Sequence, residues 1–462
     1  MPLLLRSLLW SGLDTLGTVG IGLASIIVVA RIVGPTEFGL GALAIGVTLL
    51  IMLPTTSLVH DAIVQRPTTT SLELDSAFAL SILTASIAST IAALAAVPLA
   101  AAMDEPRLAR IVWALLPTVV FSAAAAPLVA ERRRAMDFGN VSRKQLATRA
   151  AGLTAAVAVA LAGGGVWAVV TQQLVTSGSL ACALLLTTPR RLQLRLSFRA
   201  AAPLIAFSRY IIGTQLLLQV SDRVFLFAIG YVGGVSAAGF WGAGSRIVES
   251  LTGIVNATSY HVALAHFSRL QQDRAQIGRA LTTGHGLLML CVVPAITALA
   301  GSIDPLMRLL MGMDWLPVGD FVPWMLLGAL VSAHILIPAV ALTALGQPHA
   351  NLAATAATGG AALASLLLAG GLGTTVIAAI RGLAPLAGWF VLARHAASEL
   401  RDRVLRQMGD LGIDLIAVAL GLGLAHAATP TIAAWTLAAQ AVAQASLAGT
   451  MSALVLALAR PR

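Results

Sequence analysis

Charged and amide side chains recur at helical spacing inside three apolar stretches of this 462-residue chain. They are Ser7, Ser11, Asp14, Thr18 and Ser25; then Ser208, Gln215, Gln219, Asp222 and Arg223; then Ser245, Arg246, Glu249, Thr252, Asn256 and Ser259. Steps of three, four or seven residues place most of each set on one helix face. Polar groups inside a membrane span are costly and usually face other helices or water. The pattern predicts a polar surface shared by three helices.

The charged members of these sets carry most of the argument. Hydroxyl groups can simply hold neighbouring helices together, but that role needs no charge. Arg246 and Glu249 are three residues apart and can pair on one helix face. Asp222 and Arg223 are adjacent and point to different faces, so one of them needs a partner on another helix or a ligand. These residues are therefore candidates to bind a charged ligand.

The remaining candidate groups are isolated residues. Arg381 lies in the outer half of its predicted span and is a further candidate to face a cavity. His334 lies in the middle of a span, where a histidine is either a satisfied polar residue or a proton carrier. Cys182 and Cys291 lie far apart in apolar stretches and have no metal-ligand spacing. We expect no metal site and no cofactor.

The elements that must position these residues are long apolar stretches. By residue number they span 7–32, 38–60, 76–101, 109–131, 145–163, 164–186, 203–231, 234–265, 281–301, 320–346, 349–370, 372–393, 410–427 and 430–458. Each is long enough, or nearly so, to cross about 30 Å of hydrocarbon as a helix. With 58% hydrophobic and 10% charged residues, the composition excludes a soluble protein of this length. The sequence predicts an all-α polytopic membrane protein with about 14 transmembrane helices.

The loops between the stretches alternate in charge. Basic residues concentrate in the even-numbered gaps, as Arg132, Arg133, Arg134, Arg143, Lys144 and Arg149; Arg190, Arg191, Arg195 and Arg199; Arg269, Arg274 and Arg279; and Arg394, Arg401, Arg403 and Arg406. The odd-numbered gaps hold few basic residues beside several acidic ones. The positive-inside rule therefore predicts that the N and C termini are both cytoplasmic. This distribution accounts for the net charge of +10 without a nucleic-acid partner.

A glycine-bearing motif repeats between the two halves of the chain. Residues 31–39 read RIVGPTEFG and residues 231–239 read YVGGVSAAG, with glycines at the same spacing. Chance similarity between glycine turns is the alternative explanation. A true repeat predicts two six-helix lobes, residues 1–200 and 201–400, followed by a helix pair in residues 401–462. Transporters built in this way bind their substrate between the lobes.

Five short motifs follow one another in the order of a known family. They are residues 31–39 (RIVGPTEFG), 131–138 (ERRRAMDF), 163–170 (GGGVWAVV), 239–246 (GFWGAGSR, preceded by Asp222) and 266–271 (HFSRLQ). Together they resemble the polysaccharide transporters, or Wzx-type flippases, of the multidrug/oligosaccharidyl-lipid/polysaccharide superfamily. The chain departs from that family at Trp241, where a tyrosine is usual, and at Ala265 and His266, which replace a proline.

The resemblance implies a fold and a task. The family has two six-helix lobes, often with two further helices, around a cavity that opens alternately to each side. The implied substrate is an undecaprenyl-diphosphate-linked oligosaccharide, which is turned over in the bacterial inner membrane for lipopolysaccharide or exopolysaccharide biosynthesis. The implied partners are this substrate, membrane lipids, and polysaccharide polymerase and chain-length machinery. No enzyme activity is expected.

The resemblance also suggests roles for the polar residues. Arginine binds phosphate oxygens bidentately, amides can meet sugar hydroxyls, and carboxylates can bind a coupling cation or balance an empty site. The diphosphate candidates are Arg223, Arg246 and Arg381; the sugar candidates are Gln215, Gln219 and Asn256; the candidates for coupling or charge balance are Asp14, Asp222 and Glu249. The lipid tail can remain in the bilayer between the lobes.

Three other functions compete with this interpretation. A cation-coupled exporter of small drugs shares the lobed fold, but it would normally have twelve helices and an acidic pocket. A flippase for the peptidoglycan precursor belongs to the same superfamily. A membrane glycosyltransferase or polymerase is disfavoured because the chain has no aspartate-rich DxxD motif and no large outer loop. P-loop, HExxH and GxSxG motifs are also absent.

Overall fold

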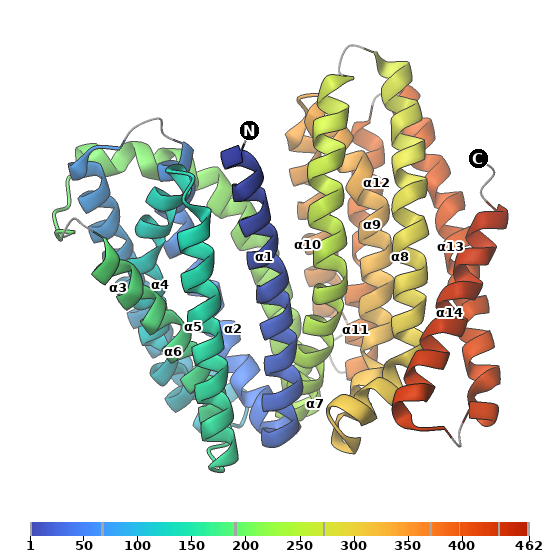
Figure 1. The fold of residues 1–462 in the computed structure, drawn as a ribbon, viewed down its shortest axis with the longest axis horizontal. Coiled ribbons are helices and arrows are strands. Elements are labelled where there is room, and N and C mark those ends of the chain that lie inside the picture. Colours follow the sequence, from blue (N-terminus) through green and yellow to red (C-terminus); the bar gives the residue numbers. More distant parts are fainter. Residues whose placement is uncertain are drawn as a thin grey trace. The chain divides into compact units, whose positions relative to one another are not determined.

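The computed structural model describes the chain except for a few short segments (Figure 1). The described residues are 2–65, 69–188, 192–270, 273–368, 372–396, 398–432 and 435–459. Within these ranges the secondary structure is helical, and no strand is present. The all-α prediction is therefore confirmed.

Two compact units divide the chain, Met1–Gly242 and Ala243–Arg462. The first unit contains α1 (Pro2–Ser25), a π-helical turn (Ile26–Ala30), α2 (Arg31–Gln65), α3 (Ser71–Ala102), α4 (Arg107–Arg134), α5 (Phe138–Leu161), α6 (Trp167–Thr187) and the greater part of α7 (Phe198–Arg269). The second contains the end of α7, α8 (Arg274–Leu310), a 3₁₀ segment (Met313–Asp320), α9 (Val322–Ala344), α10 (Pro348–Leu368), α11 (Thr374–Leu383), α12 (Pro385–His395), α13 (Ser398–Ile432) and α14 (Leu437–Ala459). The predicted division into two lobes and a helix pair stays a prediction.

The predicted apolar stretches coincide with helices over most of their described length. α7 joins the stretches 203–231 and 234–265, whereas α11 and α12 together form the stretch 372–393. Pro385, the first residue of α12, stands at the break between them. Eleven segments among the described residues are long and apolar enough to cross a membrane. The chain is a multi-pass membrane protein, while the number of crossings and the cytoplasmic termini stay predictions.

One helix lies at the centre of each unit. In the most apolar window of α4, 61% of the residues are buried, and in α9 the share is 67%. The corresponding share in α3 is 28%, and its apolar residues Ile91 and Leu94 are exposed. Outward-facing apolar side chains suit a helix that meets lipid rather than water. α4 and α9 are therefore the cores around which their bundles are built.

Side-chain caps fix the start of two helices. Thr70 and Glu73 form a capping box at α3, in which the Glu73 carboxylate accepts the Thr70 N–H at 2.8 Å. Asp273 caps α8, because its Oδ1 accepts the Gln276 N–H at 3.0 Å. Each cap satisfies a backbone donor that the first turn leaves unpaired.

The last two helices pack on α8 through small residues. α13 and α14 contact each other, and both contact α8. A Cβ on Gly301 would lie 3.0 Å from the Ala448 Cβ, and a Cβ on Gly449 would lie 3.3 Å from the Ala298 Cβ. Such close approach is how helices associate when hydrocarbon surrounds them. The C-terminal helix pair is thus an integral part of the second unit.

Candidate functional site

Two glycines break the helices within the repeated motif. Gly34 in α2 has φ 81° and ψ 167°, and Gly234 in α7 has φ 80° and ψ 175°. Residues with a Cβ rarely adopt a positive φ, so this backbone favours glycine at both positions. The repeated sequence motif therefore forms the same sharp turn twice.

The segments that follow these turns cross at two further glycines. A Cβ on Gly39 would collide with the carbonyl oxygen of Val235, and a Cβ on Gly239 would collide with the carbonyl oxygen of Pro35. The contact is reciprocal, since each glycine meets the residue after the turn of the other repeat. Only glycine allows two backbones to approach so closely. We call this contact the glycine crossing.

Two hydroxyl side chains lie beside the glycine crossing. The Thr36 Oγ1 and Ser236 Oγ atoms are 2.7 Å apart, and either can donate the hydrogen bond. These residues also occupy equivalent positions in the two copies of the motif. Because both hydroxyls can bond to water instead, the contact can be broken and remade at little energetic cost.

Glu37 of the same motif connects α2 to two other elements. Its carboxylate accepts two hydrogen bonds from the Arg107 guanidinium, both 2.8 Å long, and one of 2.9 Å from the Val166 N–H. A Cβ on Gly165 would lie only 2.7 Å from Glu37 Oε2. The bidentate geometry fixes the carboxylate. This arrangement anchors the first glycine turn to the starts of α4 and α6.

We expect Glu37→Gln to destabilise the protein. Glutamine has nearly the same size as glutamate but carries no charge. Its NH₂ group would also face the N–H donors of Arg107 and Val166. Losing charge-assisted hydrogen bonds at this partly exposed site costs roughly 1 to 2 kcal/mol. Thermal unfolding in detergent should show a lower Tm for this variant. Asp137→Asn is the control, because Asp137 is exposed and makes no capping hydrogen bond. Equal Tm values for the two variants would contradict the proposed role of Glu37.

The first unit brings together two of the predicted site residues. Arg223 Nη2 lies 3.5 Å from Gln219 Oε1, one turn earlier on α7. The aliphatic part of Arg223 lies against α2, with its Cδ 3.6 Å from where a Cβ on Gly46 would stand. Arg223 is half-buried whereas Asp222 is exposed, as expected for neighbours on different faces. The side chain of Gln215 lies outside the described residues.

Asp14 on α1 lies in a positively charged environment. Its carboxylate interacts electrostatically with Arg149 of α5 and Arg133 of α4. Asp14 Oδ1 is buried and has no hydrogen-bond partner among the described residues. The nearby guanidinium groups offset part of the cost of burying this charge. Its role as a coupling residue stays a prediction.

The second unit holds the other candidates. Arg246 Nη1 and Glu249 Oε2 are 3.9 Å apart, as their spacing predicts, and both side chains are more than half exposed. Arg381 is half-buried on α11, and its backbone carbonyl packs against Gly328 of α9. The side chain of Asn256 lies outside the described residues. The structure thus pairs Arg223 with Gln219 and Arg246 with Glu249, in separate units.

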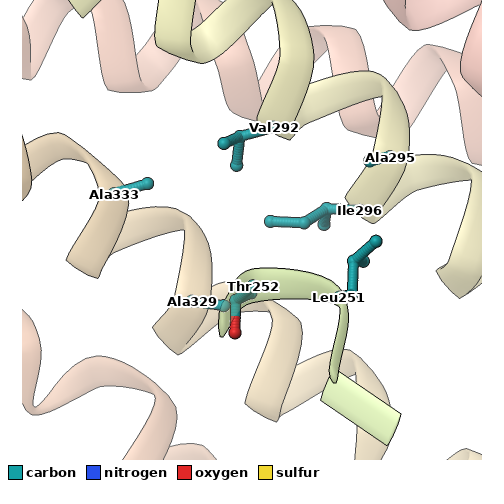
Figure 2. Close-up of a pocket in the computed structure, with 7 residues that line it drawn as sticks. All are labelled: Leu251, Thr252, Val292, Ala295, Ile296, Ala329 and Ala333. Carbon is teal, nitrogen blue, oxygen red and sulfur yellow. The ribbon is translucent and has the colours of Figure 1, made fainter. Parts of the chain in front are cut away.

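A small apolar pocket lies within the second unit, between the last part of α7, α8 and α9 (Figure 2). Its lining residues are Leu251, Thr252, Val292, Ala295, Ile296, Ala329 and Ala333. Thr252 is the one polar residue in this lining, and its hydroxyl donates to the Val248 carbonyl oxygen at 2.9 Å. The pocket therefore offers a diphosphate no charged group, and we do not assign the head group to it.

Two basic residues, Arg132 at the end of α4 and Lys144 in α5, hold the end of α6. Arg132 Nη2 donates to Thr187 Oγ1 at 3.0 Å and Thr188 Oγ1 at 3.3 Å, and Lys144 Nζ donates to Thr187 Oγ1 at 2.6 Å. Burial, together with the Arg132 charge, lowers the pKa of the Lys144 amine. Arg132 and Lys144 therefore join α4 and α5 to the end of α6.

Sequence reasoning missed several connected residues. Glu37 entered the sequence argument only within the motif 31–39 and the outer-loop charge, and Arg107 only within that charge, although the two residues bind each other. Asp414 lies within the predicted span 410–427, and His285 lies within the span 281–301. A charged group inside a span was the available signal for Asp414. Nothing in the sequence indicated its partner on another helix.

The fold is that of membrane flippases and transporters. It is similar to the solved structure of "Lipid II flippase MurJ, inward closed conformation", with a TM-score of 0.75, 12% identity, and coverage of 97% of this chain and 98% of that chain. It is also similar to an inward-facing multidrug resistance MATE family transporter of the MOP superfamily, with a TM-score of 0.52, 15% identity, and coverage of 85% and 96%. At these identities the likeness establishes the fold alone.

The sequence comparisons identify the family. A family model described as "Polysaccharide biosynthesis protein" matches residues 28–320, which is more than half of the chain. A relative is the succinoglycan biosynthesis transport protein ExoT of Rhizobium meliloti (strain 1021), 25% identical over 341 residues that cover 72% of this chain and 67% of the relative. The chain belongs to this polysaccharide biosynthesis protein family and is a multi-pass protein of the inner membrane. The predicted resemblance is confirmed.

Proposed function

We propose that this protein is a flippase for undecaprenyl-diphosphate-linked oligosaccharide repeat units. It would turn the lipid-linked repeat unit over in the inner membrane, for lipopolysaccharide or exopolysaccharide biosynthesis. The family and the named role of ExoT in succinoglycan transport support this substrate class. The observation in the structure that supports a moving transporter is the reciprocal glycine crossing of the two repeats.

The glycine crossing is suited to open and close. The predicted orientation places both glycine turns on the outer side of the membrane. There, the two repeats meet through close backbone contacts and the Thr36–Ser236 hydroxyl pair. Separating such a contact exposes few apolar atoms and leaves its hydroxyls free to bind water. We therefore assign the glycine crossing as the outer closure in an alternating-access cycle.

The head group of the proposed substrate is polar and dianionic. Arg223, Arg246 and Arg381 remain our candidates to bind its phosphate oxygens, with Gln215, Gln219 and Asn256 for the sugar hydroxyls. Arg223 is the strongest of these candidates, since it is half-buried beside an amide at 3.5 Å. A guanidinium in a low-dielectric environment attracts phosphate more strongly than one in water. Asp222 and Glu249 are the candidates to balance the charge of the empty site.

The proposed task implies particular partners. The lipid-linked oligosaccharide and membrane lipids contact the protein directly, since the lipid tail stays in the bilayer. Polysaccharide polymerase and chain-length machinery would use the translocated repeat unit on the outer side. The protein itself breaks no bond in this scheme, so we propose a transporter rather than an enzyme.

Deleting the gene tests this proposal directly. We expect lipid-linked repeat units to accumulate several-fold by mass spectrometry, with loss of surface polysaccharide, and a plasmid copy to reverse both changes. An unchanged lipid pool with intact polymer would contradict the proposal, and efflux of cationic dyes would then test a drug exporter. Death on depletion with accumulation of peptidoglycan precursor would instead identify a flippase for that lipid.

A further inference from the structure

Two histidines and an aspartate form a buried cluster in the second unit. His285 on α8 and His334 on α9 are each 2% exposed, and Asp414 on α13 is fully buried. His334 Nε2 lies 3.0 Å from Asp414 Oδ2. The two imidazole rings meet edge to face, with centroids 4.9 Å apart. Three helices therefore bring ionisable groups together, and none of the predicted substrate-binding residues is among them.

The His334 ring has a defined direction. Its Nδ1 lies 3.0 Å from the Leu330 carbonyl oxygen, one turn earlier on α9. A carbonyl oxygen can only accept a hydrogen bond, so Nδ1 carries a proton. The other nitrogen, Nε2, lies 3.0 Å from Asp414 Oδ2, in a contact that does not have the geometry of a hydrogen bond. Two acceptors at that distance repel each other, so the contact is stable only while Nε2 or the carboxyl group holds a proton.

A line of polar residues on α13 leads from this cluster toward the start of the helix. Arg403 Nη1 donates to the Gly278 carbonyl oxygen at 2.9 Å, which sets this face of α13 against α8. Gln407, one turn further, is buried, and neither of its amide atoms has a hydrogen-bond partner among the described residues. Asp410 follows, with its Oδ2 4.0 Å from His285 Nε2 and its side chain 37% exposed. Asp410 thus connects the buried cluster to an accessible surface.

The helices around the cluster carry other ionisable groups. On α13 itself these are Glu399, Arg401, Asp402, Arg403, Arg406, Asp410 and His426. α9 contributes only His334, and α14 has no ionisable residue. The other ionisable residues of α8 are Arg274, Arg279, Cys291, Asp304 and Arg308; those of α10, α11 and α12 are His349, Arg381, Arg394 and His395. Apart from Cys291, these residues lie toward the ends of their helices. No group of three His, Cys, Asp or Glu side chains in the described ranges is arranged to hold a metal ion.

We propose that His285, His334 and Asp414 form a proton-binding site, which reaches the surface through Asp410. The buried carboxylate needs an opposite charge or a proton, and the imidazole beside it can supply either. The bound proton holds α13 against α9, and its loss places two acceptors in contact in a buried site. The site therefore links the protonation state to the packing of the C-terminal helix pair.

Nitrogen-15 NMR of histidine in the full-length protein, reconstituted in lipid nanodiscs, tests the site without measuring transport. The His334 signal is assigned through His334→Gln, or through its contact with a ¹³C-labelled Leu330 carbonyl if that variant does not fold. The ring-nitrogen chemical shifts distinguish a protonated from an unprotonated nitrogen. We expect them to show a proton held between His334 and Asp414, and we expect Asp414→Asn to change the protonation of the His334 ring at the same pH.

His395 provides a matched internal control. Its Nδ1 lies 2.8 Å from the Val391 carbonyl oxygen, so it has the same backbone contact as His334, but its side chain is exposed. Its ring-nitrogen shifts should be the same with and without Asp414→Asn. A His334 signal that the Asp414 substitution leaves unchanged would overturn the proposal.

Discussion

The double variant Thr36→Cys with Ser236→Cys is expected to lose transport on oxidation and to regain it on reduction. The two hydroxyl oxygens are 2.7 Å apart, so cysteines at these positions are close enough to form a disulfide. A covalent bond across the glycine crossing would hold the outer closure shut. Since alternating access requires that contact to open, flipping should fall more than about tenfold. The native Cys182 and Cys291 are both free and would first be replaced by serine.

A second cysteine pair controls for the disulfide itself. Gly41→Cys with Val169→Cys joins α2 to α6, where a Cβ on Gly41 would lie 3.2 Å from the Val169 Cβ. Both positions belong to the first repeat, whereas Thr36 and Ser236 belong to different repeats, so this bond should leave flipping intact. Surface polysaccharide and lipid-linked repeat units are measured before and after treatment with dithiothreitol. Full activity of the oxidised Thr36–Ser236 variant would show that the glycine crossing does not open.

The helices of this fold could be predicted from the sequence because each apolar stretch is long and uninterrupted. The repeated glycine motif also had a structural meaning, since Gly34 and Gly234 adopt nearly identical backbone angles. The continuity of α7 across Gly234 could not be predicted, because a glycine at such a position in the sequence usually marks the end of a helix. The length of an apolar stretch indicates that the segment is helical, but it does not indicate where the helix bends.

The site was less predictable because its contacts join residues that are far apart in sequence. Spacing rules found the Arg246–Glu249 pair, which lies within one helix, but they did not name Gln219 as the neighbour of Arg223. They could not find Glu37 with Arg107, since that pair depends on how α2 packs against α4. The same limit applied to Asp414, whose partner His334 lies on another helix. A charge inside a span indicates that a partner exists, but packing alone decides which residue it is.

Arg223→Ala is expected to reduce flipping by about 30-fold, which corresponds to a loss of about 2 kcal/mol of binding to the transported head group. The guanidinium is half-buried, and in that environment a charged contact with phosphate is stronger than in water. Arg223→Lys should retain part of the activity, because lysine keeps the charge but not the bidentate geometry. Accumulated lipid-linked repeat units, normalised to protein level in the membrane, provide the measurement.

A purely structural role for Arg223 predicts a different pattern of variants. Arg223 also touches Gln219 and lies against Gly46, so loss of packing would make Gln219→Ala and Gly46→Ala as harmful as Arg223→Ala. If Arg223 instead binds the diphosphate, Gln219→Ala should have a mild effect, since an amide carries no charge. Arg223→Lys should then keep part of the activity that Arg223→Ala loses. Arg110→Ala removes an exposed arginine from α4 and should have no effect. Normal flipping by Arg223→Ala at a normal protein level would exclude this residue from the phosphate site.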